Sequence, residues 1–426
     1  MKSDFVRHGF AVFAATTVAN VMSYLFRFLA ARYVSVAEYG ELSALLAFVN
    51  LFLAPALILG IAVTRYSSVF HALSDVQRLK SLKHLVFGLG VACSLTLLSA
   101  GALGRPVIAN YLRVQDGLAI DGATAVIAVY FILPSLWALL QGTQKFYVYA
   151  LVTALDGVLK VSFGLMAILA GSQLGVVLLA YAAGGLISLA VVAFLLIRDD
   201  KGIIAAPIKF DFVRLGQTIG GGAASTIAIA TLSSIDLVFV QHFFVPPAVG
   251  LYAAANICGR ALLFVVGFLP TIVLPKTAHL ASKGESPLPI LFYALGVAAS
   301  VSGAILCIYF IAPALVVTFF ASAKYAGGSI YVFRYGIAMC LLACMNVIAS
   351  YRMGIHSFGY VIPLCVMALG ELLAMQFWMH GSLDQIVDTM VVGNAVALVL
   401  MVSDTLVRTR PRKRSPDSLN EVQGAR

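Results

Sequence analysis

The chain has 426 residues, of which 61% are hydrophobic and only 11% are charged, and its mean hydropathy is +0.99. A soluble globular protein needs more charged side chains than this to cover its surface, so composition excludes that class. The formal net charge is +10. The basic residues behind it lie mostly in the loops between apolar segments, so we expect no nucleic-acid partner.

Apolar runs of roughly 20 residues, the length that crosses about 30 Å of hydrocarbon, recur along the whole chain. The first run is too long for a signal peptide and lacks a small-residue cleavage site, so we expect it to be retained. The pattern predicts an all-α polytopic membrane protein with about twelve transmembrane helices and no loop large enough for a nucleotide-binding domain. The expected spans are 9–31, 41–63, 84–104, 119–141, 147–171, 174–197, 217–241, 249–273, 287–311, 329–351, 358–380 and 386–407.

The distribution of Lys and Arg among the loops predicts the orientation, because cytoplasmic loops are enriched in these residues. If the N-terminus is cytoplasmic, only a handful of the 28 Lys and Arg residues fall in outside loops. We therefore expect a multi-pass protein of the inner (cytoplasmic) membrane, with both termini in the cytoplasm. The predicted outside residues are Arg32, Arg105, Arg113, Lys324 and Arg334.

Two stretches, residues 34–68 and 245–282, have the pattern of two copies of one unit. Each begins with a short loop ending in a glycine, Gly40 or Gly250, and continues into one apolar helix that ends near a basic residue. The two glycines are 210 positions apart, about half the chain. A membrane protein built from two similar halves usually places its substrate site between them, so the repeat indicates a transporter.

We expect residues 1–201 to form an N-terminal lobe of six helices and residues 202–408 a C-terminal lobe of six helices. Because each lobe has an even number of spans, the two pseudo-symmetric lobes relate by an axis along the membrane normal. Residues 409–426 are basic and are expected to be a disordered cytoplasmic tail. The segment 64–83 is expected to include an amphipathic surface helix.

Three basic residues fall inside predicted spans, where a charge is costly and marks a candidate functional site. Arg260 lies about 17 Å into its span, so we expect it to face an aqueous cavity. Arg27 lies near the outer end of the first span, where it either reaches the interface or lines the cavity. Lys160 is one turn from Asp156; the pair either neutralises itself or releases the lysine to an anionic ligand.

The second half contains most of the acids at membrane depth. Asp236, Glu371 and Asn394 lie at similar predicted depths in spans seven, eleven and twelve. Their oxygens are suited to a hard cation such as Na⁺, and a proton carried by Glu371 is the other option for a coupling ion. The alternative is that Asp236 pairs with Arg260 and Glu371 is a buried neutral acid. We expect no other cofactor and no metal.

The AEYG loop after the first span, the matching VGLY motif and the two-times-six organisation resemble the Wzx-type polysaccharide flippases of the MOP superfamily. The resemblance covers residues 6–406. It implies a MATE-like fold and a flippase that moves a polyprenyl-pyrophosphate-linked oligosaccharide from the cytoplasmic to the periplasmic leaflet by alternating access. It also implies a cationic central cavity, a role open here to Arg260, Lys160 and Arg27.

Such a protein is not an enzyme. It serves the synthesis of a surface glycan, such as lipopolysaccharide O-antigen or exopolysaccharide, among membrane lipids, and either works alone or beside a polysaccharide polymerase or ligase. Two alternatives stay open. A cation-coupled multidrug antiporter of the same superfamily shares the helix plan and would use the acids of the second half. A membrane-embedded glycan polymerase or ligase would need a large outside loop, which the predicted spans do not leave.

Overall fold

A computed structural model describes residues 2–198, 212–283 and 285–408, with the side chains of 17–198, 220–281, 283 and 285–407. In this part of the chain all regular structure is helical. The helices are α1 (Lys2–Tyr33), α2 (Val36–Ala72), α3 (Val76–Leu112), α4 (Gly117–Gly142), α5 (Phe146–Leu169), α6 (Leu174–Arg198), α7 (Phe212–Leu232), α8 (Ile235–Phe243), α9 (Pro246–Val266), α10 (Leu269–Ser282), α11 (Leu288–Ile311), α12 (Pro313–Phe320), the 3₁₀ helix η1 (Ala323–Gly328), α13 (Ser329–Gly354), α14 (Val361–Phe377) and α15 (Leu383–Arg408).

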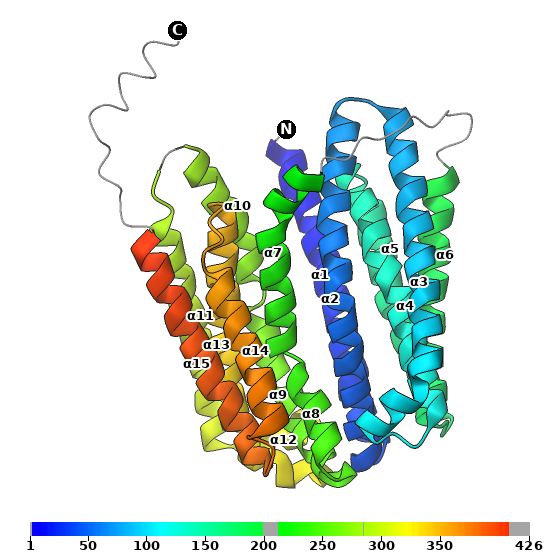
Figure 1. Ribbon diagram of the computed structural model, residues 1–426, viewed down its shortest axis with the longest axis vertical. Helices are drawn as coiled ribbons and strands as arrows, with labels where there is room; N and C mark the ends of the chain where they lie inside the picture. The colour runs from blue at the N-terminus through cyan, green and yellow to red at the C-terminus, as the bar shows by residue number, and fades with distance from the viewer. Residues whose placement is uncertain (1, 199–211, 284, 409–426) are drawn as a thin grey trace.

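The predicted polytopic all-α fold is confirmed. Ten helical segments of the described residues are long and apolar enough to cross a membrane. The remaining two predicted spans correspond to α1, which has 32 residues, and α14, which is apolar but has only 17. The twelve-span prediction therefore agrees with the observed helices. In the view of Figure 1 the helices run side by side, and α15 ends toward the face at which α1 begins, as an even number of spans requires.

Helices α1–α6 form one six-helix half, and α7–α15 supply the six spans of the other. Within the first half α2 packs on α4, α4 on α6, and α1 and α6 on α5. The expected boundary at residue 201 and the tail 409–426 both lie outside the described residues.

The start of α2 is defined by a short local sequence motif. Ser35 caps it, accepting from the Glu38 N–H while the Glu38 carboxylate accepts from the Ser35 N–H, a complete capping box.

One sequence-based expectation is wrong. The segment 64–83 forms no separate surface helix, because α2 continues to Ala72 and α3 starts at Val76 after a tight turn. Spans seven and eight are present, and each has a short break, after Leu232 and after Val266. Between α11 and α13 lie the eight-residue α12 and the 3₁₀ helix η1, both too short to span a membrane.

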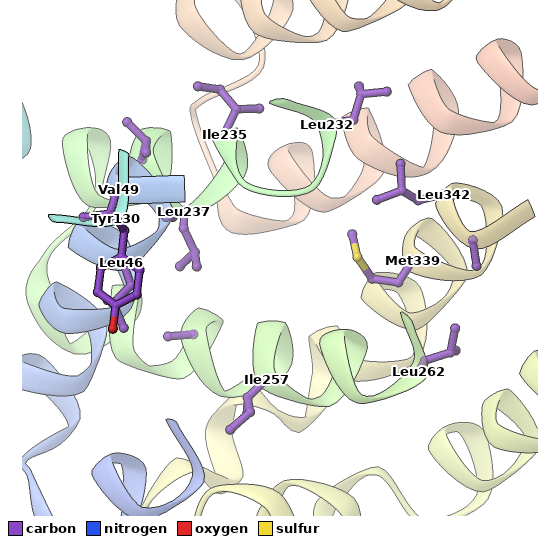
Figure 2. Close-up of a cluster of buried hydrophobic side chains, with 14 of the residues drawn as sticks. Leu46, Val49, Tyr130, Leu232, Ile235, Leu237, Ile257, Leu262, Met339 and Leu342 are labelled. Carbon is purple, nitrogen blue, oxygen red and sulfur yellow. The ribbon is translucent and has the colours of Figure 1, made fainter. Parts of the chain in front are cut away.

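The two halves meet along α2, which packs against α7, α8 and α9 of the second half. Figure 2 shows part of the apolar cluster at this seam, where Leu46 and Val49 of α2 belong to the same cluster as Leu237 of α8 and Ile257 of α9. These four side chains are at most 6% exposed. Burial of apolar surface therefore holds the halves together at this level, and polar contacts add to it at the end predicted to face outside.

At that outer end the two repeat glycines meet. A Cβ on Gly40 would lie 2.6 Å from the backbone nitrogen of Gly250 and 2.9 Å from the carbonyl carbon of Val249. Helices approach this closely only where neither carries a side chain at the contact. Around the contact Tyr39 packs edge-on against Tyr325, with ring centroids 5.5 Å apart. We call this group of residues, Tyr39, Gly40, Val249, Gly250 and Tyr325, the outer closure.

Arg352 of α13, although it is charged, is among the largest fully buried side chains of the described residues. It forms an ion pair with Asp404 of α15 at 2.8 Å and donates to the carbonyl and hydroxyl of Ser357 and to the Thr405 hydroxyl. This network ties the α13–α14 connection to α15. It contains none of the candidate site residues, and we assign it to stability.

We expect Arg352→Gln to lower the free energy of unfolding by about 3 kcal/mol, because the change leaves the half-buried Asp404 carboxylate without its charge partner. The midpoint of thermal unfolding in detergent measures this loss. The double variant Arg352→Met with Asp404→Leu removes both charges and should recover part of the stability. A single variant that melts at the wild-type temperature would contradict a stabilising role.

Candidate functional site

Arg27 lies in α1, one turn before the buried residues Ala30 and Ala31, and is itself partly exposed. It lines a cavity of about 180 Å³ between α1, α2, α4, α5 and α6. Among the described side chains it forms no hydrogen bond and no ion pair. An arginine that binds nothing in its own protein has five N–H donors available for an anion. It is the best-placed anion-binding group that the structure describes.

Arg260 of α9 is also partly exposed, but it has protein partners. Its Nε donates to the Asn256 side-chain oxygen at 3.0 Å, and one Nη donates to the Ser233 carbonyl at 3.0 Å and the Ser234 hydroxyl at 3.2 Å. The two serines form the break between α7 and α8, where backbone carbonyls lose their helical partners. Arg260 thus bridges this break, and all three partners are neutral, so its positive charge is not cancelled by a direct ion pair.

Arg27 and Arg260 lie near enough for their charges to repel. Their helices touch where the Tyr24 hydroxyl donates to the Ile257 carbonyl at 3.3 Å. Because α1 and α9 run in opposite directions, Arg27 lies three residues toward the outer end from this contact and Arg260 three residues toward the inner end. One anionic group lying between them would relieve the repulsion.

Lys160 of α5 is enclosed within the first half, and its side chain is 9% exposed. Its Nζ lies 3.3 Å from Asp156 Oδ2, and Asp156 Oδ1 accepts from the Tyr130 hydroxyl at 2.9 Å. The Nζ also lies 5.5 Å from the centre of the Tyr130 ring and 5.9 Å from that of Tyr181. The predicted pairing with Asp156 is present, and Lys160 still lines the same cavity as Arg27. Of the three predicted cations, Lys160 therefore shares a cavity with Arg27, and Arg27 lies near Arg260.

Asp236 at the start of α8 is fully buried. Its Oδ2 accepts from the hydroxyls of Tyr252 at 3.0 Å and Tyr335 at 2.9 Å, whereas its Oδ1 has no donor. The alternative of a direct pair with Arg260 is not what the structure has. Asn256 links the two groups instead, since its amide donates to the Tyr335 hydroxyl and its oxygen accepts from Arg260.

Glu371 of α14 and Asn394 of α15 are buried beside α8, which packs against both helices. Neither Glu371 carboxyl oxygen has a hydrogen-bond donor, and the Asn394 side-chain oxygen also lacks one. Asn394 is oriented by its amide, which donates to the Ala338 carbonyl at 3.1 Å. The Glu371 carboxyl group packs directly on Gly393 and interacts electrostatically with Asp236. Asp236 and Glu371 are thus buried near enough to interact, and the buried Asn394 directly follows Gly393, on which Glu371 packs; all three have acceptor atoms unused.

Sequence reasoning missed the neutral partners of these charges. Asn50 of α2 lines the cavity of Arg27 and Lys160. Tyr130, Tyr252, Tyr335 and Asn256 hold the carboxylates and Arg260. A signal was present, because each is a hydrogen-bonding residue inside an apolar span, but tyrosine is also common at membrane interfaces. No cluster of three or more His, Cys, Asp or Glu side chains suited to a metal occurs among the described residues.

The arrangement has a definite polarity. The two arginines are partly exposed and have no acidic partner among the described residues, whereas the acids at membrane depth, Asp156, Asp236 and Glu371, are at most 3% exposed. A ligand that reaches these side chains therefore meets cationic groups first. The arrangement is suited to binding an anion.

No family model matches the sequence, and no curated protein matches it. Solved structures do match the fold. An inward-facing multidrug resistance MATE family transporter of the MOP superfamily superposes with a TM-score of 0.71 at 13% identity, covering 93% of this chain and 98% of that one. The lipid II flippase MurJ in an inward closed conformation gives 0.69 at 14% identity, covering 92% and 87%. An outward-facing MATE transporter gives 0.58 at 14% identity, covering 96% of each chain. This chain thus has the fold of the MOP-superfamily transporters.

Proposed function

We propose that the protein is a MOP-superfamily transporter of the flippase type. It moves a polyprenyl-pyrophosphate-linked oligosaccharide from the cytoplasmic to the periplasmic leaflet. The observation that supports an anionic substrate most directly is Arg27, a partly exposed arginine without a partner among the described residues, near Arg260. The similarity to MurJ, described as a lipid II flippase, is in keeping with this substrate class.

The chemistry of the substrate explains why such a site is needed. A pyrophosphate bearing sugars does not cross hydrocarbon unaided, because removing a charged group from water costs many kcal/mol. Arginine is suited to the phosphates, since its planar guanidinium donates paired hydrogen bonds. Alternating access between the two halves would keep the head group solvated by protein throughout. Moving it to a positive exterior is also favoured by the membrane potential.

In the cell we place the protein in the inner membrane, where it supplies the substrate of surface-polysaccharide synthesis, O-antigen or exopolysaccharide. It performs no covalent chemistry itself. A polysaccharide polymerase or ligase that consumes the translocated lipid is the expected partner. The experiment that tests the function is the leaflet distribution of lipid-linked oligosaccharide in cells with and without the gene. Accumulation in the cytoplasmic leaflet, reversed by the wild-type gene, supports the proposal.

We further propose that Asp236, Glu371 and Asn394 bind the coupling ion, Na⁺ or a proton. Four buried oxygens of these residues have no donor, and a buried carboxylate without a partner is unfavourable unless it is protonated or binds a cation. A bound Na⁺ or proton would compensate one of the two carboxylate charges, and the second carboxyl group would need a proton of its own. Because α8, α14 and α15 carry the ligands, ion binding would change how these helices pack.

We expect Glu371→Gln to abolish stimulation of transport by an ion gradient while leaving the protein folded, because the amide keeps the shape but carries no charge. Translocation in proteoliposomes with imposed Na⁺ or proton gradients measures this. The matched control is Asp384→Asn, which changes a carboxyl group of α15 that is paired with Arg334 at the surface. Gradient stimulation that survives in Glu371→Gln would remove this residue from the ion site.

The alternative function is a cation-coupled multidrug antiporter, favoured by the MATE structure with its TM-score of 0.71. Such a protein would bind organic cations through accessible acids. The buried state of Asp236 and Glu371 is unfavourable to direct drug contact. Unchanged lipid-linked oligosaccharides, together with altered sensitivity of the cells to cationic drugs, would favour the antiporter.

A further inference from the structure

We propose that the N-terminal half holds the substrate's head group in a two-compartment site. This proposal rests on the proposed function and specifies how the bound substrate is oriented. The first compartment is the cavity of Arg27, Asn50 and Lys160, which we call the phosphate compartment. The second is a neighbouring cavity that includes Asn20, Trp137 and Gln141, which we call the sugar compartment. Ser23 and Lys160 line both.

The phosphate compartment has the chemistry of an anion site. Its lining includes two cations, Arg27 and Lys160, and no acid. Asn50 adds an amide that forms no hydrogen bond with any described residue. Tyr130 and Tyr181 close it with ring faces and hydroxyl groups. Charged and neutral N–H donors converging on one small space are what a phosphate group requires.

The size of the phosphate compartment limits what it can take. Its volume is about 180 Å³, room for roughly six water molecules at about 30 Å³ each. Pockets for drug-sized molecules are larger, about 300 Å³ or more. A phosphate or diphosphate is therefore the class of group that fits, whereas a sugar chain or an aromatic drug does not.

The sugar compartment differs from the phosphate compartment in both its chemistry and its size. It has a volume of about 430 Å³, and its lining combines apolar side chains, the Trp137 ring and neutral hydrogen-bonding groups from Asn20, Gln141 and Thr153. The Trp137 indole N–H has no acceptor among the described residues. Sugar hydroxyls both donate and accept, so they match neutral amides and a free indole donor. The one acid in the lining, Asp156, already faces Lys160, which disfavours an organic cation here.

The junction of the two compartments fits the covalent order of the substrate, in which the first sugar is attached to a phosphate. Lys160 lies at this junction, and Asp156 is its positioning residue: it holds the Nζ at 3.3 Å and is itself held by Tyr130. The head group would bind with its phosphates toward Arg27 and its first sugar toward Trp137. Arg260 would then contact the phosphates from the other half.

Isothermal titration calorimetry tests this arrangement by measuring how soluble probes bind to the full-length protein in detergent. The probes are inorganic phosphate and the 1-phosphates of glucose, galactose and N-acetylglucosamine, which differ only in the sugar. We expect at least one sugar phosphate to bind more tightly than inorganic phosphate to the wild type. Trp137→Phe should abolish that difference, about threefold to tenfold, without changing the affinity for inorganic phosphate.

Asn50→Leu should weaken all four probes by about threefold to tenfold, because it removes a donor of the phosphate compartment. Lys160→Gln leaves Asp156 buried without its partner and is a risk to folding, so the double variant Asp156→Asn with Lys160→Gln is measured beside it. We expect at least about a tenfold loss for all four probes in the double variant. Lys276→Gln, the same change at an exposed position of α10, should bind as wild type.

Equal affinity of the wild type for inorganic phosphate and every sugar phosphate would overturn the sugar compartment. Wild-type affinity in both Asn50→Leu and the double variant would overturn the phosphate compartment. These failures are separable from failure of the proposed function. If the compartments are wrong, lipid-linked oligosaccharide still accumulates in the cytoplasmic leaflet without the gene. If the function is wrong, that lipid does not accumulate, whatever the probes bind.

Discussion

Arg27→Gln should lower the rate of head-group translocation by about tenfold to a hundredfold while the protein folds and inserts normally. Arg27 forms no hydrogen bond or ion pair with a described residue, so its removal takes no contact from the protein itself. A charge-assisted hydrogen bond to an anion contributes about 1.5–3 kcal/mol. Losing this free energy from the transition state lowers the rate by about tenfold to a hundredfold. Flipping of a fluorescent polyprenyl-pyrophosphate oligosaccharide in proteoliposomes measures the effect.

Arg260 makes a useful comparison because its role is double. It bridges the break between α7 and α8, so Arg260→Ala should abolish transport and also lower the thermal unfolding temperature. Arg27→Gln should lower transport alone. Lys276→Gln, with the same charge change at an exposed site, is the control. Wild-type transport by Arg27→Gln would remove the residue from the substrate site and with it the main support for an anionic substrate.

The architecture of this protein was largely predictable from its sequence, and the physical reason is the bilayer. A spanning segment must be helical and about 20 residues long, so apolar runs locate the helices almost without ambiguity. Helix breaks were not predictable. The break after Leu232 depends on Arg260, 28 residues further on, which supplies hydrogen bonds to the Ser233 carbonyl and the Ser234 hydroxyl. A tertiary contact of this kind leaves no mark on local composition.

The candidate site was predictable in its charges and not in their pairing. Arg27, Lys160 and Arg260 stand out as rare cations in apolar spans, and Asp236 and Glu371 as rare acids. Whether each is accessible depends on which face of its helix meets the neighbouring helices. Sequence pattern defines this poorly when a helix is apolar on all sides. The partial exposure of the arginines and the burial of the acids, which favour an anionic over a cationic substrate, therefore required the structure.

Gly40→Ala should hold the protein open at its outer end and slow the transport cycle. The added methyl would lie 2.6 Å from the Gly250 nitrogen and 2.9 Å from the Val249 carbonyl carbon, which are backbone atoms and cannot rotate away. Forcing such an overlap costs about 1–3 kcal/mol, so the outer-closed state loses about fivefold to 150-fold in population. An outward-open state would separate the two helices and would not meet this clash.

The readout is a cysteine at Val249, which is fully buried in the outer closure. In a background without the six native cysteines, a membrane-impermeant maleimide added from outside should label Val249→Cys slowly. Adding Gly40→Ala should make labelling fast. Gly104→Ala is the matched control, because a Cβ there meets only the tip of Ile108 at an ordinary 3.7 Å.

The same labelling experiment tests whether contact between the two copies of the repeat closes the outer end during transport. Gly40 and Gly250 occupy matching places in the two copies of the repeat, and they lie in contact in the closed state. If contact between the copies is what closes the outer end, Gly250→Ala should reproduce the labelling of Gly40→Ala, since its added methyl would meet the Val36 carbonyl. Unchanged labelling in both variants would show that closure tolerates a side chain there, and that the glycines serve static packing instead of the transport cycle.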